Sequence, residues 1–119
     1  AALSSLNTRL VSKLMEIPES HLNSPEDGAD HIVSVRFTGI KGEVLVHFLE
    51  QRGVYVSMGA ACSSRHSSVS HVLQAIGLTP DEAAATIRIG LSPKLSLDQI
   101  DYAAEMIAES VAEVRSIYG

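Results

Sequence analysis

Several residue types are scarce in this sequence, and each scarcity excludes a class of protein. The 119 residues contain no tryptophan. They contain a single cysteine, so an internal disulfide is excluded, and this cysteine content is typical of a protein in a reducing compartment. No run of about 18 apolar residues is present, which argues against a membrane-spanning helix. Nine basic residues are scattered among 14 acidic ones, and the net charge of −5 argues against a nucleic-acid surface. We therefore expect a cytoplasmic protein that binds neither nucleic acid nor membrane.

The composition that remains is that of a compact globular domain. Apolar residues make up 45% of the chain and charged residues 19%. A chain of this length supports a hydrophobic core of its own, so residues 1–119 are expected to form one domain. Because the sequence starts inside a helical pattern, we also expect it to be a fragment of a longer protein.

Helical periodicity and helix-end signals recur along the chain. Apolar residues at three- and four-residue steps predict amphipathic helices, and Gly53 is expected to end one of them in a left-handed conformation. Thr79 with Glu82, and Ser96 with Gln99, have the spacing of capping boxes. The predicted helices cover residues 2–16, 44–52, 69–76, a short segment from 80, and 97–118.

Alternating apolar and polar residues predict the strands. The segments are 32–37, 54–57 and 86–91, with a short edge strand at His21 and Leu22. In the last segment Ile87 and Ile89 share the core side, so Arg88 must point to the opposite face. The order of elements predicts an α+β fold in which three or four mixed or antiparallel strands are covered by helices.

The single cysteine, Cys62, lies in a segment of small residues between a predicted strand and a predicted helix. One interpretation is a buried structural cysteine, which is the usual fate of a lone cysteine. The other is a reactive thiol, because the flanking Gly, Ala and Ser residues are typical of an exposed loop and Arg65 and His66 follow closely. The residues alone leave both interpretations open.

Other candidate sites are weaker. Cys62, His66 and His71 are metal-ligand types, but their spacing matches no closed zinc site, so no metal is expected. A Cys–His pair of the thiol-protease kind lacks that family's sequence setting around the sulfur. Arg88 suits bidentate binding of a carboxylate, with a surface salt bridge as the alternative. Arg36 is interpreted as a solvated strand residue.

The segment Gly-Val-Tyr-Val-Ser-Met-Gly-Ala-Ala-Cys-Ser-Ser at 53–64 resembles the active-site segment of cysteine desulfurases, the NifS/IscS-like members of the class V aminotransferases. Further similar segments keep the family's order through almost the whole chain. They are a strand and "GE" helix start at 35–43, the helix after the cysteine at 70–78, the arginine strand at 87–92 and the start of the last helix at 97–102.

This resemblance implies that the chain is the C-terminal small domain of a fold-type I, pyridoxal-phosphate-dependent enzyme whose large domain is absent here. Cys62 would then be the catalytic nucleophile that takes sulfur from L-cysteine and carries it as a persulfide, leaving L-alanine. Arg88 would bind the substrate carboxylate. A sulfur-acceptor protein and a homodimeric parent are also implied.

The same resemblance places the cofactor's Schiff-base lysine in the missing domain. Lys13, Lys41 and Lys94 are the lysines present, and none has the family's motif around it, so no cofactor-binding residue is expected in this chain and the fragment alone is expected to be inactive. Two alternatives stay open: a divergent class V aminotransferase or lyase, and a non-catalytic α+β module that binds a small carboxylate. These residues do not specify which pathway the parent enzyme would serve, iron–sulfur cluster assembly being one of those open to it.

Overall fold

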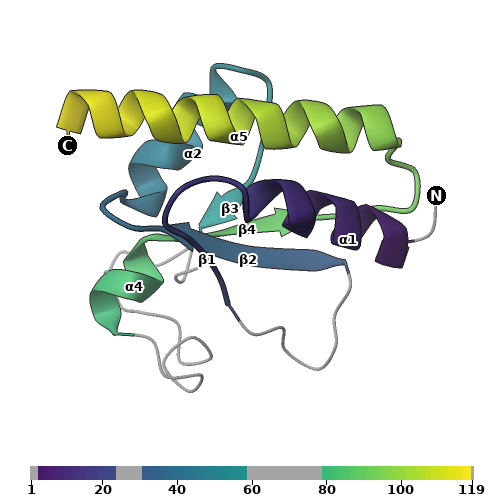
Figure 1. Cartoon of the computed structure of the whole chain (residues 1–119), viewed down its shortest axis with the longest axis horizontal. Coiled ribbons are helices and arrows are strands. Elements are labelled where there is room, and N and C mark those ends of the chain that lie inside the picture. The colour runs from purple at the N-terminus through teal and green to yellow at the C-terminus, as the bar shows by residue number, and fades with distance from the viewer. Residues whose placement is uncertain (1–2, 24–30, 59–78, 119) are drawn as a thin grey trace.

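A computed structural model of the chain describes residues 3–23, 31–58 and 79–118. These residues form an α+β fold, as predicted, in which helices lie against a four-stranded sheet (Figure 1). The predicted helix at 69–76 lies outside the described residues. The elements are α1 (Leu3–Leu14), β1 (Ser20–Leu22), β2 (Ile32–Phe37), α2 (Gly42–Glu50), β3 (Ser57–Met58), α4 (Pro80–Ala84), β4 (Thr86–Gly90) and α5 (Leu97–Tyr118).

The strands are ordered β1-β2-β4-β3, and every neighbouring pair is antiparallel. The longest pairing joins β2 to β4 at the centre of the sheet, where Val33 lies opposite Ile89 and Val35 lies opposite Ile87. Burial alternates from Val33 to Val35 and from Ile87 to Ile89, because these residues are buried while Ser34 and Arg88 occupy the other face. Of the two arrangements expected from sequence, mixed or antiparallel, the structure has the antiparallel one.

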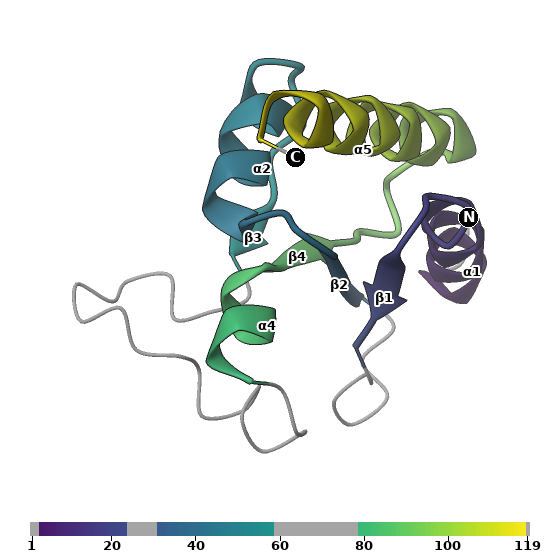
Figure 2. The ribbon, with the colours of Figure 1, turned by 60° about the vertical axis from the view of Figure 1, so that its left-hand side comes forward.

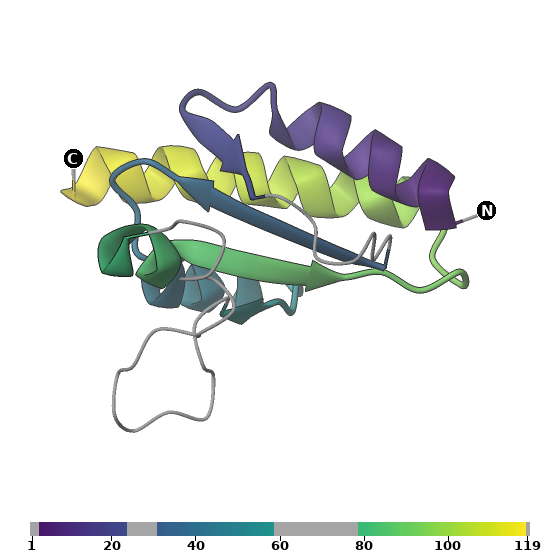
Figure 3. The same ribbon diagram turned by 90° about the horizontal axis from the view of Figure 1, so that it is seen from below.

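Three helices cover one face of the sheet. Figure 2 shows α1, α2 and α5 on one side of the strands and α4 on the other, and Figure 3 shows β2 and β4 in front of α5 when the molecule is seen from below. We call the face opposite these three helices the open face. The polar side chains of the two central strands, β2 and β4, lie on this face.

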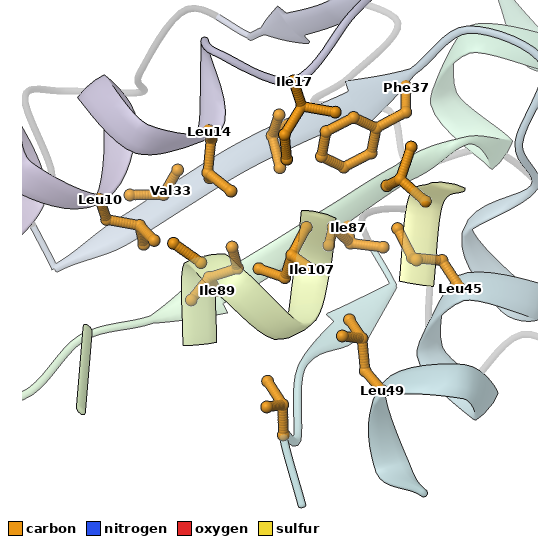
Figure 4. Packing of buried hydrophobic residues seen from close by; sticks show 14 of the residues in the cluster. Leu10, Leu14, Ile17, Val33, Phe37, Leu45, Leu49, Ile87, Ile89 and Ile107 are labelled. Atoms are coloured by element: carbon orange, nitrogen blue, oxygen red, sulfur yellow. The ribbon is translucent and has the colours of Figure 1, made fainter. Parts of the chain in front are cut away.

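The core lies between the sheet and these helices. Leu10 and Leu14 of α1, Leu45 of α2 and Ile107 of α5 are fully buried against the apolar face of β2 and β4 (Figure 4). Each such side chain contributes about 1.5–3 kcal/mol by its burial. The helices therefore fix the sheet from one side, and Ser34 and Arg88 of the central strands lie on the open face.

The helix-end signals are confirmed. Gly53 has a φ of 79°, and its amide and that of Val54 donate to the carbonyls of Glu50 and Leu49, which is the Schellman pattern. The predicted strand at 54–57 begins later in the structure: the amide of Val54 is used by the cap of α2, and the described part of β3 is Ser57 and Met58.

Candidate functional site on the open face of the sheet

Arg88 occupies the middle of β4 and is exposed, whereas its neighbours Ile87 and Ile89 are buried. The predicted orientation away from the core is thus confirmed. In the sheet register Arg88 lies opposite Ser34 of β2 on one side and Ser57 of β3 on the other. Within the described part of the chain its guanidinium forms no hydrogen bond or ion pair, so a positive charge flanked by two serines is available to an anionic ligand.

A second arginine shares this face. Arg36 of β2 lies opposite Thr86, two residues from Arg88 along β4. Its side chain is only 20% exposed, and its Nη2 lies 3.3 Å from the Oε2 of Glu82. The interpretation of Arg36 as a solvated residue was therefore wrong, because α4 packs on this end of the sheet and brings Glu82 to it. Nε of Arg36 is buried and has no hydrogen-bond partner among the described residues.

Glu82 uses its two carboxylate oxygens for two different purposes. Oε1 accepts a hydrogen bond from the amide of Thr79 at 2.9 Å, while the Thr79 hydroxyl accepts one from the amide of Glu82, so the predicted capping box is present. Oε2 faces Arg36. The hydrogen bond from Thr79, and then the positive charge of Arg36, hold the pKa of Glu82 below its usual range.

A buried polar chain fixes the corner between α4 and β4. The hydroxyl of Thr86 donates to the carbonyl of Glu82 at 2.9 Å and accepts a hydrogen bond from Nδ2 of Asn23 at 3.1 Å. Asn23 is 6% exposed and Thr86 is fully buried. Sequence reasoning missed both residues, since Asn23 lies in a stretch whose composition indicates a surface connection. Only the pairing of β1, β2 and β4 brings them together.

Gly42 is needed at the same corner for a steric reason. A Cβ on this residue would lie 3.0 Å from the carbonyl oxygens of both Ala84 and Thr86. The start of α2 therefore packs directly against the backbone that leads into β4. This contact from the helix side and the Asn23–Thr86 hydrogen bond from the open face together set the position of β4, and with it the position of Arg88.

The predicted nucleophile Cys62 lies outside the described residues, as do His66 and His71. What the structure does place is the strand from which that segment departs. β3 is the edge strand that pairs with β4, and its Ser57 lies directly opposite Arg88. Of the two predicted site residues the structure therefore places Arg88, together with the strand that precedes the Cys62 segment in the sequence.

The ligand-type side chains and the lysines decide whether this chain could hold a metal ion or the cofactor. Among the described residues no three His, Cys, Asp or Glu side chains gather in a manner that could hold a metal ion. The three lysines are all described: Lys13 of α1 faces Asp101 of α5 at 3.7 Å, and Lys41 and Lys94 are exposed residues outside the strands. None of the three lies in a strand of the sheet that carries Arg88.

Comparison with known families identifies the class of protein to which this chain belongs. The family model for class-V aminotransferases matches residues 1–103. The chain belongs to this family, whose members depend on pyridoxal phosphate.

Among the curated relatives are cysteine desulfurases. The chain is 35% identical over 119 residues to the cysteine desulfurase IscS of Clostridium botulinum, an alignment that covers 97% of this chain and 30% of that protein. It is also 35% identical to the corresponding proteins of Archaeoglobus fulgidus, over 94% of this chain and 30% of the relative, and Klebsiella pneumoniae, over 98% and 29%. The chain thus spans about 30% of the length of the relatives it matches.

Solved structures show the same fold. A NifS-like protein superposes with a TM-score of 0.76 at 29% sequence identity, covering 93% of this chain and 27% of the other. A NifS-like protein from Rickettsia africae superposes with a TM-score of 0.74 at 21% identity, covering 92% and 28%. In the described part of the present chain, no helix has the length and apolar character needed to cross a membrane.

Proposed function

We propose that this chain is the C-terminal small domain of a cysteine desulfurase, a longer enzyme that removes sulfur from L-cysteine and passes it to an acceptor. The observation that carries the proposal is the exposed Arg88 at the centre of the open face, beside the strand that leads into the Cys62 segment. The 35% identity to cysteine desulfurases over nearly the whole chain supports it.

Arg88 binds the carboxylate of the substrate in this proposal. Its position is suited to that role for two physical reasons. The strand on which it lies is held rigidly by the buried Thr86 and by core residues on the opposite face, so the guanidinium starts from a fixed backbone. The side chain is exposed and has no competing carboxylate among the described residues, so a ligand carboxylate can take both donors of one edge of the guanidinium.

Cys62 is the sulfur acceptor. Its thiolate attacks the sulfur of bound L-cysteine, the bond between that sulfur and the β-carbon breaks, and the carbon fragment gains a proton to become L-alanine. The sulfur stays on Cys62 as a persulfide, so L-cysteine and one thiol are converted to L-alanine and one persulfide. Pyridoxal phosphate, when bound in the parent enzyme, would supply the electron withdrawal for this reaction.

The proposal extends to the parent protein and its partners. The remaining part of the enzyme would hold the cofactor, a second copy of the parent would complete a homodimer, and an acceptor protein would collect the persulfide sulfur. The fragment alone would have no desulfurase activity. An alternative within the same family is an aminotransferase or lyase that acts on another amino acid, and an alternative outside enzymes is a module that binds a small carboxylate at Arg88.

The test uses the full-length protein that contains this chain. With L-cysteine and a thiol reductant, the wild-type protein should form equal amounts of L-alanine and sulfide, and Cys62→Ala should form neither above background. Ser63→Ala is the matched control, because it makes a similarly small change next to the sulfur and should retain activity. Full turnover by Cys62→Ala would contradict the assignment of the nucleophile. Turnover of other amino acids in place of L-cysteine would favour the divergent family member.

A further inference from the structure

The open face contains two arginines with different electrostatic environments. In the antiparallel register Arg36 pairs with Thr86 and Arg88 pairs with Ser34, so the two arginines are diagonal neighbours. Such positions lie about 7–8 Å apart, within reach of one another for side chains as long as arginine. Arg36 is paired with Glu82, whereas Arg88 has no partner among the described residues.

Glu82 is held in place independently of Arg36. One of its carboxylate oxygens belongs to the capping box with Thr79, and the backbone carbonyl of the same residue accepts the hydroxyl of Thr86. Its negative charge is therefore fixed at this end of the sheet by the helix start and by the α4–β4 corner. A charge fixed by other contacts acts on any ligand that approaches, as well as on Arg36.

We propose that Glu82 determines the charge selectivity of the open face by neutralising Arg36, so that Arg88 alone anchors a ligand carboxylate and monocarboxylates are favoured over dicarboxylates. A second carboxylate near Arg36 would lose its hydration while meeting a guanidinium that is already paired and a carboxylate that repels it. The inference rests on the proposed function only in that Arg88 binds a carboxylate. For the amino-acid substrate it implies an uncharged side chain, with dicarboxylic amino acids rejected.

The chain offers a precise substitution to test this selectivity. Glu82→Gln removes the charge but keeps a side-chain oxygen for the Thr79 amide, because glutamine serves in a capping box as glutamate does. Asp81→Asn is the matched control: it removes the same charge one residue away, from an exposed side chain of α4 that does not pair with Arg36. Circular dichroism melting curves establish that each variant is folded.

Binding is measured by calorimetry on the full-length protein, with propionate as the monocarboxylate and succinate as the dicarboxylate. In Glu82→Gln we expect succinate to bind about tenfold more tightly, because a freed guanidinium adds one charge-assisted contact, while propionate changes by less than about twofold. Asp81→Asn should leave both constants nearly unchanged. The double variant Arg36→Gln/Glu82→Gln should lose the gain for succinate.

The outcomes separate this inference from the proposed function. No gain for succinate in Glu82→Gln, or a gain that persists in the double variant, would overturn the selectivity role of Glu82. Equal binding of propionate by wild type and Arg88→Gln would instead overturn the assignment of Arg88. If Glu82→Gln does not fold, Arg36→Gln provides the test. In this variant the unpaired Glu82 should weaken the binding of succinate several-fold more than that of propionate. An unchanged ratio of the two dissociation constants would contradict the proposal.

Discussion

Ser57 of β3 lies directly opposite Arg88 of β4 in the antiparallel sheet. This pairing joins the strand that precedes the Cys62 segment to the strand that carries the proposed carboxylate anchor. Among the described residues β3 pairs with β4 at two positions, Ser57 with Arg88 and Met58 with Ile87. Arg88 itself lies on the central strand β4, which pairs with β2 on one side and with the edge strand β3 on the other.

Substitution of Arg88 should reduce substrate affinity without unfolding the protein. Arg88→Ala in the full-length enzyme is expected to weaken L-cysteine binding by about 1.5–3 kcal/mol, the usual contribution of a charged hydrogen-bonded contact. Arg88→Lys should recover part of the loss, because it restores the charge but not the bidentate geometry. The measurement is the dissociation constant for L-cysteine together with the thermal midpoint. A large drop in thermal midpoint with unchanged affinity would mean that Arg88 is structural.

The reactivity of Cys62 should distinguish an exposed thiol from a buried one. In the 119-residue chain, which contains a single cysteine, we expect iodoacetamide to alkylate native protein nearly as fast as urea-denatured protein. A buried cysteine would be protected by orders of magnitude, since modification would wait for the fold to open. Alkylation followed by mass spectrometry gives both rates. Strong protection in the native state would indicate that Cys62 is a buried structural residue and not an exposed reactive thiol.

Arg115 of α5 should be one of the most sensitive surface positions for stability. Its guanidinium donates hydrogen bonds to the carbonyl oxygens of Pro18 at 2.6 Å and Thr38 at 3.0 Å, and reaches that of Glu19 at 3.5 Å. It thereby joins the last helix to the turns that flank β1 and β2. We expect Arg115→Ala to cost about 1–3 kcal/mol in the free energy of unfolding, because carbonyls lose charged donors.

Urea unfolding measures this cost, and Arg115→Lys provides the comparison. Lysine keeps the positive charge but cannot serve three carbonyls from one planar group, so it should restore only a minor part of the stability. If the lysine variant were as stable as wild type, charge alone would account for the effect, and the geometry of the three hydrogen bonds would be unimportant.

Stability should depend on pH through Asp101, which joins α5 to α1. Two hydrogen bonds from Arg9, at 2.7 and 2.8 Å, hold the pKa of Asp101 below its ordinary value of 3.8. The unfolded chain lacks this pairing and binds a proton more readily, so acid favours unfolding. The stabilising contribution is present above pH 3.8 and is lost as the pH falls through the lower pKa of the folded state.

Asp101→Asn tests this pH dependence. The variant should be less stable than wild type at pH 7, and the difference should shrink in acid as wild type loses the ion pair. Urea midpoints at pH 7 and at about pH 2.5 are compared, with the exposed Glu105→Gln of the same helix as the control for an altered charge. A difference that stays constant between the two pH values would show that the carboxylate charge plays no part.

The sequence by itself determined the features that depend on neighbouring residues. The capping box of Ser96 and Gln99 forms as its spacing predicts, and Gly53 takes the left-handed conformation that ends α2. Alternation along β4 placed Arg88 away from the core, because successive side chains of a strand point to opposite faces. The sequence also predicted the family, and the match of the class-V aminotransferase model to residues 1–103 agrees with that prediction.

Only the tertiary structure decided how distant residues meet on the open face. Asn23 and Thr86 are 63 positions apart and form a buried hydrogen bond, while Arg36 meets a glutamate of α4 that no local pattern connects to it. These contacts depend on which strands pair and in what register, and a strand pattern of period two fixes a face but not a partner. For that reason the exposed orientation of Arg88 was predictable, and the ion pair between Arg36 and Glu82 beside it was not.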